Sequence, residues 1–465
     1  MMNPPELQTE EMLRPPVNRS MRVLDRSFFN RRIPLSAARI FNSQNISAVR
    51  NTLTKSGDGL FLPRITTIRK DPDPSLAASG RKCYLLRPSL KHNDQGSWGP
   101  TVSEMVSQQN IGVIPYELEI GYNDWTYQEI MEAILPEEAA EGELPTGFTN
   151  VGHVAHLNLR EQYLPHKHLI AQVLMDKNTS VRTVINKVDN VGEESEYRTF
   201  QYEVLAGPDD LMVEVSEENC LFRFDYAKVY WNSRLNTEHH RMVNNFKPGE
   251  AVCDVMAGVG PFAVPAGKKG IFVWANDLNP DSYKWLDDAI TRNKVANYVR
   301  PFNEDGGKFI KRAAVELLST DHGVKKVVKG PSKRKTLNAD GPKGADVGEQ
   351  SVVIKQPKFF SHFVMNLPAS AITFLPSFIG IYAGPEFAGQ EIPMPMVHVY
   401  TFGLKGDDNT PEFERICRDA SELIGAPVTL DDPETEVFDV RDVAPKKRMF
   451  CCSFRLPREA AFRKP

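Results

Sequence analysis

The 465-residue sequence has few cysteines, no long hydrophobic run and no large excess of charge of either sign. Its six cysteines include no CxxC pair and are too sparse for a disulfide framework, which indicates a reducing compartment and no structural zinc site. No stretch approaches the roughly 18 consecutive apolar residues of a membrane-spanning helix. Because 56 basic and 60 acidic residues give a net charge of -4, a nucleic acid partner would require local basic surface.

Changes in composition along the chain suggest three domains, about the number expected for this length. Residues 1–18 are rich in proline and acids, which is typical of a disordered leader. We expect an N-terminal domain that ends near residue 113, a small α+β domain at 114–223 and an α/β domain at 224–465. Within the last domain, the Lys-, Gly- and Pro-rich residues 321–348 predict a disordered insertion, with a basic tether for RNA as the alternative.

Two segments of the chain are strongly basic. Residues 19–50 contain seven arginines against one acid, together with a second methionine, Met21, and resemble a mitochondrial presequence. The alternative is a basic first strand and helix that face RNA, because residues 33–49 also have the apolar spacing of a folded core. Residues 441–465 have eight basic residues against two acids and are either a phosphate contact or a solvated tail.

From residue 251 onward, short apolar runs alternate with helical segments. The runs 251–255 and 271–275 predict strands, and a helix is expected near 281–295. Alternating βα units of this kind predict a doubly wound parallel sheet. The runs 428–430 and 449–454 predict antiparallel strands that close the sheet.

The segment DVMAGVGPF, which begins at Asp254, follows the first of these strands. Gly258 and Gly260 would expose bare backbone N–H groups at the carboxyl edge of the sheet, where nucleotide-like ligands bind. The third glycine of a dinucleotide fingerprint is missing, which argues against a nicotinamide oxidoreductase. Asp277, at the end of the next strand, can accept hydrogen bonds from ribose hydroxyls. The two features suit an adenosine ligand, with a plain tight turn as the alternative.

Polar residues at two further strand ends could complete this site. A carboxylate in the segment before Gly306, such as Asp305, could hold an adenine amino group or could form a turn. In FVMNLP, Pro368 restricts Leu367 to extended geometry, which would fix Asn366 in the cleft. An Asx turn that ends the strand is the plain alternative for Asn366.

A helix expected upstream of the glycine segment carries further charged residues. Arg234 and Glu238 are four residues apart and would share one helix face, which also fits a simple surface ion pair. His239 and His240 have no further ligands at metal spacing, so we expect no metal site.

Taken together, these segments resemble the archaeal and eukaryotic tRNA (guanine-N1)-methyltransferase family over roughly residues 110–465. The resemblance rests on TGFTNVGHVAHLNLRE (146–161), YRTFQYEVLAG (197–207), SRLNTEH (233–239), DVMAGVGPF (254–262) and FVMNLP (363–368). It implies a class I methyltransferase fold, that is, a Rossmann-like doubly wound α/β sheet preceded by two smaller α+β domains. It also implies S-adenosylmethionine (SAM) as methyl donor, no metal, and methylation of N1 of guanosine 37 in tRNA.

The resemblance also implies roles for single residues. Arg198 matches the family arginine that faces guanine O6, and Glu238 matches the carboxylate proposed as general base. Asn366 and Pro368 match the edge that holds the target base. The positions that fall at the family's methyl-donor contacts are His239, Asp277, Leu278, Asp305, Gly306 and Asn366. His239 departs from the family pattern, because the archaeal proteins carry arginine there.

Two other functions stay open on the sequence. One is the wybutosine-pathway enzyme that shares this fold and donor but transfers the aminocarboxypropyl group, and the other is a non-catalytic tRNA-binding scaffold. Glu238 and the Asn366–Pro368 edge favour methyl transfer. We expect a monomer that binds tRNA and no membrane, with forms started at Met1 or Met21 supplying the mitochondrial matrix, the nucleus and the cytoplasm.

Overall fold

The computed structural model describes residues 13–62, 65–137, 144–188, 197, 199–328 and 350–464. The chain divides into two compact units, one formed by residues 1–148, 157–186 and 204–208, the other by residues 149–156, 187–203 and 209–465. Within the described ranges, no helix is both long and apolar enough to cross a membrane. All six cysteines are buried and none is in a disulfide.

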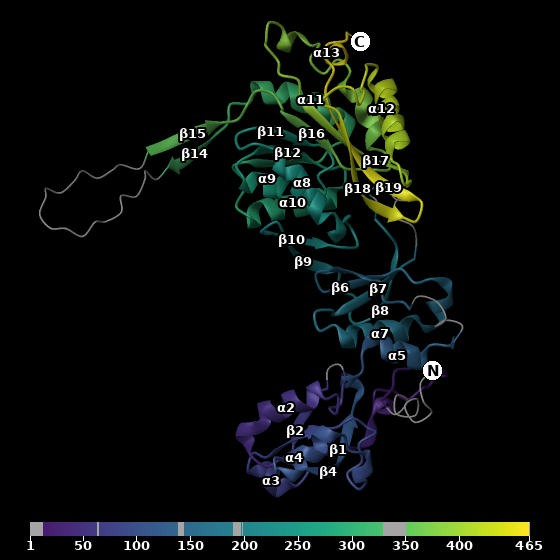
Figure 1. The fold of residues 1–465 in the computed structure, drawn as a ribbon. Coiled ribbons are helices and arrows are strands. Elements are labelled where there is room, and N and C mark those ends of the chain that lie inside the picture. Colours follow the sequence, from purple (N-terminus) through teal and green to yellow (C-terminus); the bar gives the residue numbers. More distant parts are fainter. Residues whose placement is uncertain are drawn as a thin grey trace, which may run out of the picture. The chain divides into compact units, whose positions relative to one another are not determined.

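The first unit begins with a four-stranded antiparallel sheet in the order β2-β3-β1-β4 (Figure 1). Its strands are β1 (Arg31–Ile40), β2 (Ile68–Lys70), β3 (Lys82–Leu85) and β4 (Ile111–Ile120), and its helices are α2 (Ile46–Lys55), α3 (Pro74–Ala78) and α4 (Pro100–Ser107). One core joins Ile40, Leu53 and Val102 from a strand and two helices. The boundary predicted near residue 113 falls inside β4, which pairs with β1 along its whole length.

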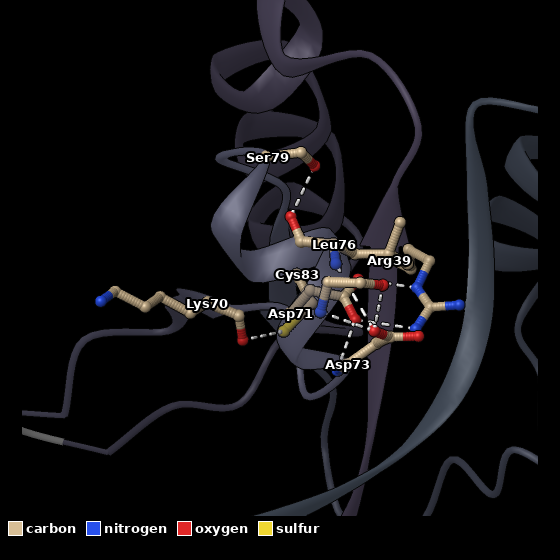
Figure 2. A network of polar contacts seen from close by, with 8 residues as sticks. Arg39, Lys70, Asp71, Asp73, Leu76, Ser79 and Cys83 are labelled. Atoms are coloured by element: carbon tan, nitrogen blue, oxygen red, sulfur yellow. Dashed lines mark hydrogen bonds and ion pairs between the residues drawn. The ribbon is translucent and has the colours of Figure 1, made fainter.

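An ion pair joins Arg39 of β1 to Asp71, the residue that follows β2, as Figure 2 shows. Arg39 donates from Nε and Nη2 to the two carboxylate oxygens of Asp71, both at 2.7 Å, and the Asp71 side chain is fully buried. Burial alone would raise the pKa of Asp71, but the hydrogen bonds from Arg39 lower it. Burial raises the pKa of the neighbouring Cys83 thiol to about 12. Arg39 therefore has a structural partner within the first unit.

Other arginines of the basic segment also have partners in the first unit. Arg19 donates to the carbonyl oxygen of Leu135 at 2.5 Å, and Arg26 forms two hydrogen bonds with Asp176 at 2.8 and 3.0 Å. Met21 is buried. These contacts agree with the folded-domain interpretation of residues 19–50, and the presequence interpretation stays a prediction.

The remainder of the first unit is helical around α5 (Tyr127–Ile134) and α7 (Lys167–Lys177). Helix α5 begins at a capping box, in which Thr126 Oγ1 accepts from the Glu129 N–H at 3.1 Å and Glu129 accepts from the Thr126 N–H at 2.7 Å. The strands of residues 149–206 are β5 (Thr149–Val151), β6 (Val154–Leu157), β7 (Thr183–Lys187) and β8 (Tyr202–Ala206). In the second unit, β5 and residues 154–156 of β6 form a hairpin.

One seven-stranded sheet organises the second unit, in the order β13-β12-β11-β16-β17-β19-β18 (Figure 1). The strands are β11 (Ala251–Asp254), β12 (Phe272–Asn276), β13 (Val299–Phe302), β16 (His362–Met365), β17 (Met396–Leu404), β18 (Glu436–Ala444) and β19 (Lys447–Arg455). The first five in this order are parallel, and β19 is antiparallel to both of its neighbours. The doubly wound α/β sheet of a class I methyltransferase is confirmed.

Helices follow the parallel strands in the alternation that the sequence predicts. They are α8 (Asn236–Asn244), α9 (Ala263–Lys268), α10 (Pro280–Arg292), α11 (Gly306–Ser319), α12 (Thr410–Ile424) and α13 (Arg458–Ala461). Like the β5–β6 hairpin, two further strand pairs lie outside the large sheet. They are β9 (Met212–Glu217) with β10 (Cys220–Asp225), and β14 (Gly323–Val328) with β15 (Gln350–Lys355).

Two predictions for the second unit are wrong. Residues 428–430 form no strand, because Ser421 Oγ bonds both the N–H and the carbonyl of Val428, at 2.9 and 3.1 Å, and β18 occupies the place beside β19. Residues 323–328, expected within a disordered insertion, form β14, in which Val324 is paired with Ile354. The remainder of the predicted insertion, from residue 329, lies outside the described residues.

Candidate functional site

The turn after β11 brings backbone groups to the carboxyl edge of the sheet. Gly258 and Gly260 have φ angles of +57° and +93°, which favour glycine. A Cβ atom at Gly260 would lie 2.7 Å from Leu286 Cδ1, so this glycine permits close packing. A Cβ at Gly258 would meet nothing within 4 Å, so its backbone lies beside open space. Gly260 therefore permits close packing against Leu286, whereas Gly258 leaves its backbone accessible from the open space beside it.

Asp277 connects this turn to the end of β12. Its Oδ2 accepts from the Gly258 N–H at 2.8 Å, and its Oδ1 accepts from the Asn279 N–H at 2.9 Å. Burial raises the pKa of Asp277, although these backbone hydrogen bonds and one from Ser282 oppose the shift. An ionised carboxylate has about four acceptor positions, so one is left for a ligand hydroxyl.

A cavity surrounds this turn at the carboxyl ends of β11, β12, β13 and β16, and we call it the glycine-turn pocket. Its lining includes most of the predicted donor contacts, namely Gly258, Asp277, Leu278, Asp305, Gly306 and Asn366. Asp305 also caps α11 by accepting from the Lys308 N–H at 3.0 Å. The strand order reverses between β11 and β16, and open α/β sheets bind ligands at such a switch point.

The other predicted donor contacts are not part of that lining. Asp254 is buried at the end of β11 with both carboxylate oxygens unpartnered, and its pKa is raised well above the usual range by burial and by nearby Asp277. His239 is buried, shares a hydrogen bond with Glu217 of β9 through Nδ1, and lies edge-on to the Phe262 ring. Its partner comes from a distant hairpin, which the sequence could not indicate.

A second cavity adjoins the first, and we call it the aromatic pocket. Its lining is dominated by aromatic and aliphatic side chains with two arginines: Thr149, His156, Phe200, Tyr226, Tyr230, Trp231, Asn232, Arg234, Leu235, Asn366, Pro368, Phe402, Arg441, Val443 and Met449. Tyr230 and Asn366 line both cavities. Of the predicted residues, Asn366 thus lies where the two cavities meet, and Pro368 lines the aromatic pocket alone.

Three rings form one wall of the aromatic pocket. His156 stacks on Phe200 with a centroid distance of 5.3 Å and an interplanar angle of 6°, and Phe200 contacts Tyr226 edge-on at 5.3 Å. His156 Nδ1 shares a hydrogen bond of 3.2 Å with the Tyr226 hydroxyl. Burial, with the charges of Lys187 and Arg234, lowers the pKa of His156 to about 4, so its ring is neutral near pH 7. An aromatic cluster of this kind suits contact with a planar ring.

Of the two residues predicted to carry the chemistry, Glu238 is among the residues that the structure describes. Arg198 lies outside the described residues. Glu238 is buried in α8, where it accepts two hydrogen bonds of 2.7 Å from Arg241 and one of 2.6 Å from the Tyr400 hydroxyl. The predicted face shared with Arg234 is not used for an ion pair, and Glu238 is absent from the lining of both pockets.

The sequence did not identify the aromatic wall or the role of Arg441 in the pocket. These side chains come from segments around residues 156, 200, 226 and 441, and no periodicity joins them. Arg441 appeared only as one member of a basic stretch. Within the described ranges, no group of three or more His, Cys, Asp or Glu side chains could hold a metal ion.

Comparison with known families and relatives gives a consistent result. The chain matches the family models "TYW2 N-terminal domain" at residues 127–210 and "TRM5/TYW2 methyltransferase domain" at residues 213–323. It is 50% identical over 465 residues to a Fusarium vanettenii protein named "tRNA (guanine(37)-N(1))-methyltransferase", covering 98% of each chain. Relatives of the same name from Aspergillus fumigatus and Schizosaccharomyces pombe are 52% and 43% identical, covering 98% and 95% of this chain and 96% and 95% of theirs.

Solved structures show the same fold at lower identity. Trm5b from Pyrococcus abyssi is 23% identical with a TM-score of 0.55, covering 90% of this chain and 99% of its own. The structure described as the complex of aTrm5 and tRNALeu is 19% identical with a TM-score of 0.58, covering 90% and 100%. At these identities the likeness supports the fold alone.

Proposed function

Because this chain belongs to the tRNA (guanine(37)-N(1))-methyltransferase family, we propose that it transfers the methyl group of SAM to N1 of guanosine 37 in tRNA. One observation carries the proposal: Asn366 and Tyr230 line both the glycine-turn pocket and the aromatic pocket. A methyl donor in the first cavity and a base in the second would therefore meet at these side chains.

The residues of the glycine-turn pocket fit the adenosine part of SAM. The open space beside Gly258 admits a ligand close to the backbone, and Asp277 keeps an acceptor position for a ribose hydroxyl. Asp305 and Leu278 complete the lining around the adenine of SAM. When bound, SAM supplies an electrophilic methyl group on a positively charged sulfur.

The aromatic pocket fits a purine that has left its stack. Turning the base out costs a few kcal/mol, which contacts in the pocket have to offset. The His156, Phe200 and Tyr226 rings offer stacking surface, and Asn366 offers an amide that can donate to or accept from a purine edge. Pro368 contributes to the same edge of the pocket.

The reaction needs a base and a positive charge near the purine. N1 of neutral guanine carries a proton, so its lone pair can attack only as that proton leaves, and negative charge then develops on O6. A carboxylate within hydrogen-bond reach of N1 typically contributes 10²–10⁴-fold, and a guanidinium at O6 stabilises charge that grows in the transition state. We assign these roles to Glu238 and Arg198, on the resemblance to the family.

The contacts of Glu238 set a condition on this assignment. Oε1 accepts from both Arg241 and Tyr400, whereas Oε2 accepts only from Arg241. Oε2 therefore keeps an acceptor position for the N1 proton. Because Glu238 is not part of the pocket lining, its side chain has to turn toward the pocket when tRNA binds, with Arg241 as the residue that positions it.

The test is methylation of a tRNA transcript followed by primer-extension mapping of the modified position. A stop next to guanosine 37, with label arriving from the methyl group of SAM and unchanged by a chelator, is the expected result. Label arriving from the methionine chain would instead identify an aminocarboxypropyl transferase. Transfer of neither label would identify a non-catalytic tRNA-binding protein.

The roles within the site have their own test. Glu238→Gln should lower kcat by about 10²–10⁴-fold while the affinity for S-adenosylhomocysteine stays unchanged. Glu436→Gln, at an exposed position of β18, is the matched control and should keep full activity. If Glu238→Gln keeps full kcat while Asn366→Ala loses it, methyl transfer stands and Glu238 is not the base.

We also propose that the enzyme acts as a monomer and is supplied to the mitochondrial matrix, the nucleus and the cytoplasm. A start at Met21 would remove Arg19 and its bond to the Leu135 carbonyl, so the shorter form should have a less stable first unit. Light scattering tests the mass of the particle in solution. Imaging of products started separately at Met1 and Met21 tests the location. Exclusion of both products from mitochondria would reject the proposed supply to the mitochondrial matrix.

A further inference from the structure

The aromatic pocket carries an unbalanced positive charge. Arg234 and Arg441 both line it, and among the described residues of its lining there is no aspartate or glutamate. The two guanidinium groups are close enough that the charge of Arg234 contributes to lowering the pKa of Arg441, after burial as the larger cause. Arg234 is exposed and Arg441 is half-buried, so the two like charges repel each other through solvent, and an anion that contacts both would relieve that repulsion.

Arg441 has unused donors at this position. Its Nε donates to the backbone carbonyl of Asp442 at 3.0 Å, whereas its Nη1 is buried and has no hydrogen-bond partner. A buried guanidinium N–H without an acceptor is costly, and native proteins rarely retain one without a reason. Nearby arginines of the same sheet do have partners, since Arg448 is paired with Asp439 and Asp442.

The strand itself positions this side chain. The register of β18 against β19 shifts between Asp439 and Arg441, so one residue of β18 is unpaired there. Bulges of this kind redirect the side chain that follows them. Arg234 reaches the same cavity from the turn before α8, where Asn232 accepts from its backbone N–H at 3.1 Å. The pair is thus held by two separate elements of the second unit.

We infer that Arg441, together with Arg234, binds a backbone phosphodiester of the nucleotide whose base enters the aromatic pocket. This inference rests on the proposed function, which supplies the polyanionic substrate. Guanidinium groups bind phosphate oxygens through paired N–H donors, and each such contact strengthens binding of the whole tRNA rather than the choice of base. The site therefore holds a nucleotide by its phosphate as well as by its ring.

The decisive experiment combines a protein change with a neutral linkage in the RNA. Arg441→Met is assayed with tRNA that carries a methylphosphonate immediately 5′ or immediately 3′ of guanosine 37, by tRNA binding and by kcat/KM. Arg441→Met should weaken binding of unmodified tRNA by about 10- to 100-fold and reduce the salt slope by about 0.7–0.9. One of the two neutral linkages should weaken tRNA binding by the wild type by a similar factor. The same linkage should weaken binding by Arg441→Met by no more than about twofold.

Control variants keep the interpretation clear. Arg418→Met removes the same charge from an exposed position of α12 and should change binding by less than about twofold. Arg441→Lys keeps the charge and should keep the salt slope while losing part of the affinity. Affinity for S-adenosylhomocysteine and the melting temperature report whether each variant is folded.

The inference is overturned if both neutral linkages cost Arg441→Met as much as they cost the wild type, because the two changes would then act independently. It is also overturned if folded Arg441→Met binds unmodified tRNA like the wild type. Failure of the wild type to methylate any tRNA would instead reject the proposed function, while the binding measurements would still decide the phosphate contact.

Discussion

Removal of the Asp277 carboxylate tests whether the glycine-turn pocket is the donor site. Asp277→Ala deletes the acceptor of the Gly258 and Asn279 N–H groups, at 2.8 and 2.9 Å, together with the acceptor position left for a ribose hydroxyl. A hydrogen bond to a charged group is worth about 1.5–3 kcal/mol, so S-adenosylhomocysteine should bind about 10- to 150-fold more weakly. Isothermal titration calorimetry measures this affinity directly.

The same change should have only a moderate effect on folding. Burial raises the pKa of Asp277, so its charged form carries a desolvation cost that alanine relieves and that partly offsets the two lost backbone hydrogen bonds. Asp287→Ala, at an exposed position of α10, is the matched control and should leave affinity unchanged. A folded Asp277→Ala protein that binds S-adenosylhomocysteine within about twofold of the wild type would refute the assignment.

Three further predictions concern stability. Gly260→Ala should lower the melting temperature more than Gly258→Ala, because only the Gly260 Cβ would meet Leu286 at 2.7 Å, and equal effects would contradict this packing role. Because burial holds the pKa of His398 well below 6.5, the unfolded chain binds more protons at this residue below that pH. The contribution of His398 to the unfolding free energy should therefore be full above pH 6.5 and fall by up to about 2 kcal/mol by pH 5. Urea unfolding of His398→Asn should show a shallower fall, and an identical one would exclude this cause. Arg39→Leu leaves a buried charge at Asp71 and should cost the first unit about 3 kcal/mol, seen as faster hydrogen exchange in β1; unchanged exchange would contradict it.

The position of the glycine-turn pocket could be predicted from the sequence because it depends on local features. Parallel strands end at the same edge of a sheet, so residues that directly follow β11, β12, β13 and β16 have to lie close together. Asp277 and Asn366 line the glycine-turn pocket for this reason. His239 is not part of that lining, and its contact with Glu217 joins α8 to a hairpin that no local pattern connects with it.

The strand pairing at the antiparallel end of the sheet was harder to predict. Residues 428–430 are apolar enough for a strand, but the backbone N–H and carbonyl of Val428 form hydrogen bonds with the Ser421 hydroxyl. The actual edge strand, β18, has the sequence EVFDVRDVA, in which polar and apolar residues do not alternate regularly and only Val437 is buried, so its strand pattern is weak in sequence. The choice between the two segments depends on contacts with α12 and β19.

By itself, the sequence determined the class of the sheet, the glycine turn, the acids at the strand ends and the family, because each of these depends on residues within contiguous segments. Only the tertiary structure decided that an aromatic pocket adjoins the glycine-turn pocket, that Arg234 and Arg441 share the aromatic pocket, and that Glu238 is held by Arg241 and Tyr400. These contacts join residues far apart in the chain, and long-range packing rather than local preference determines which of them meet.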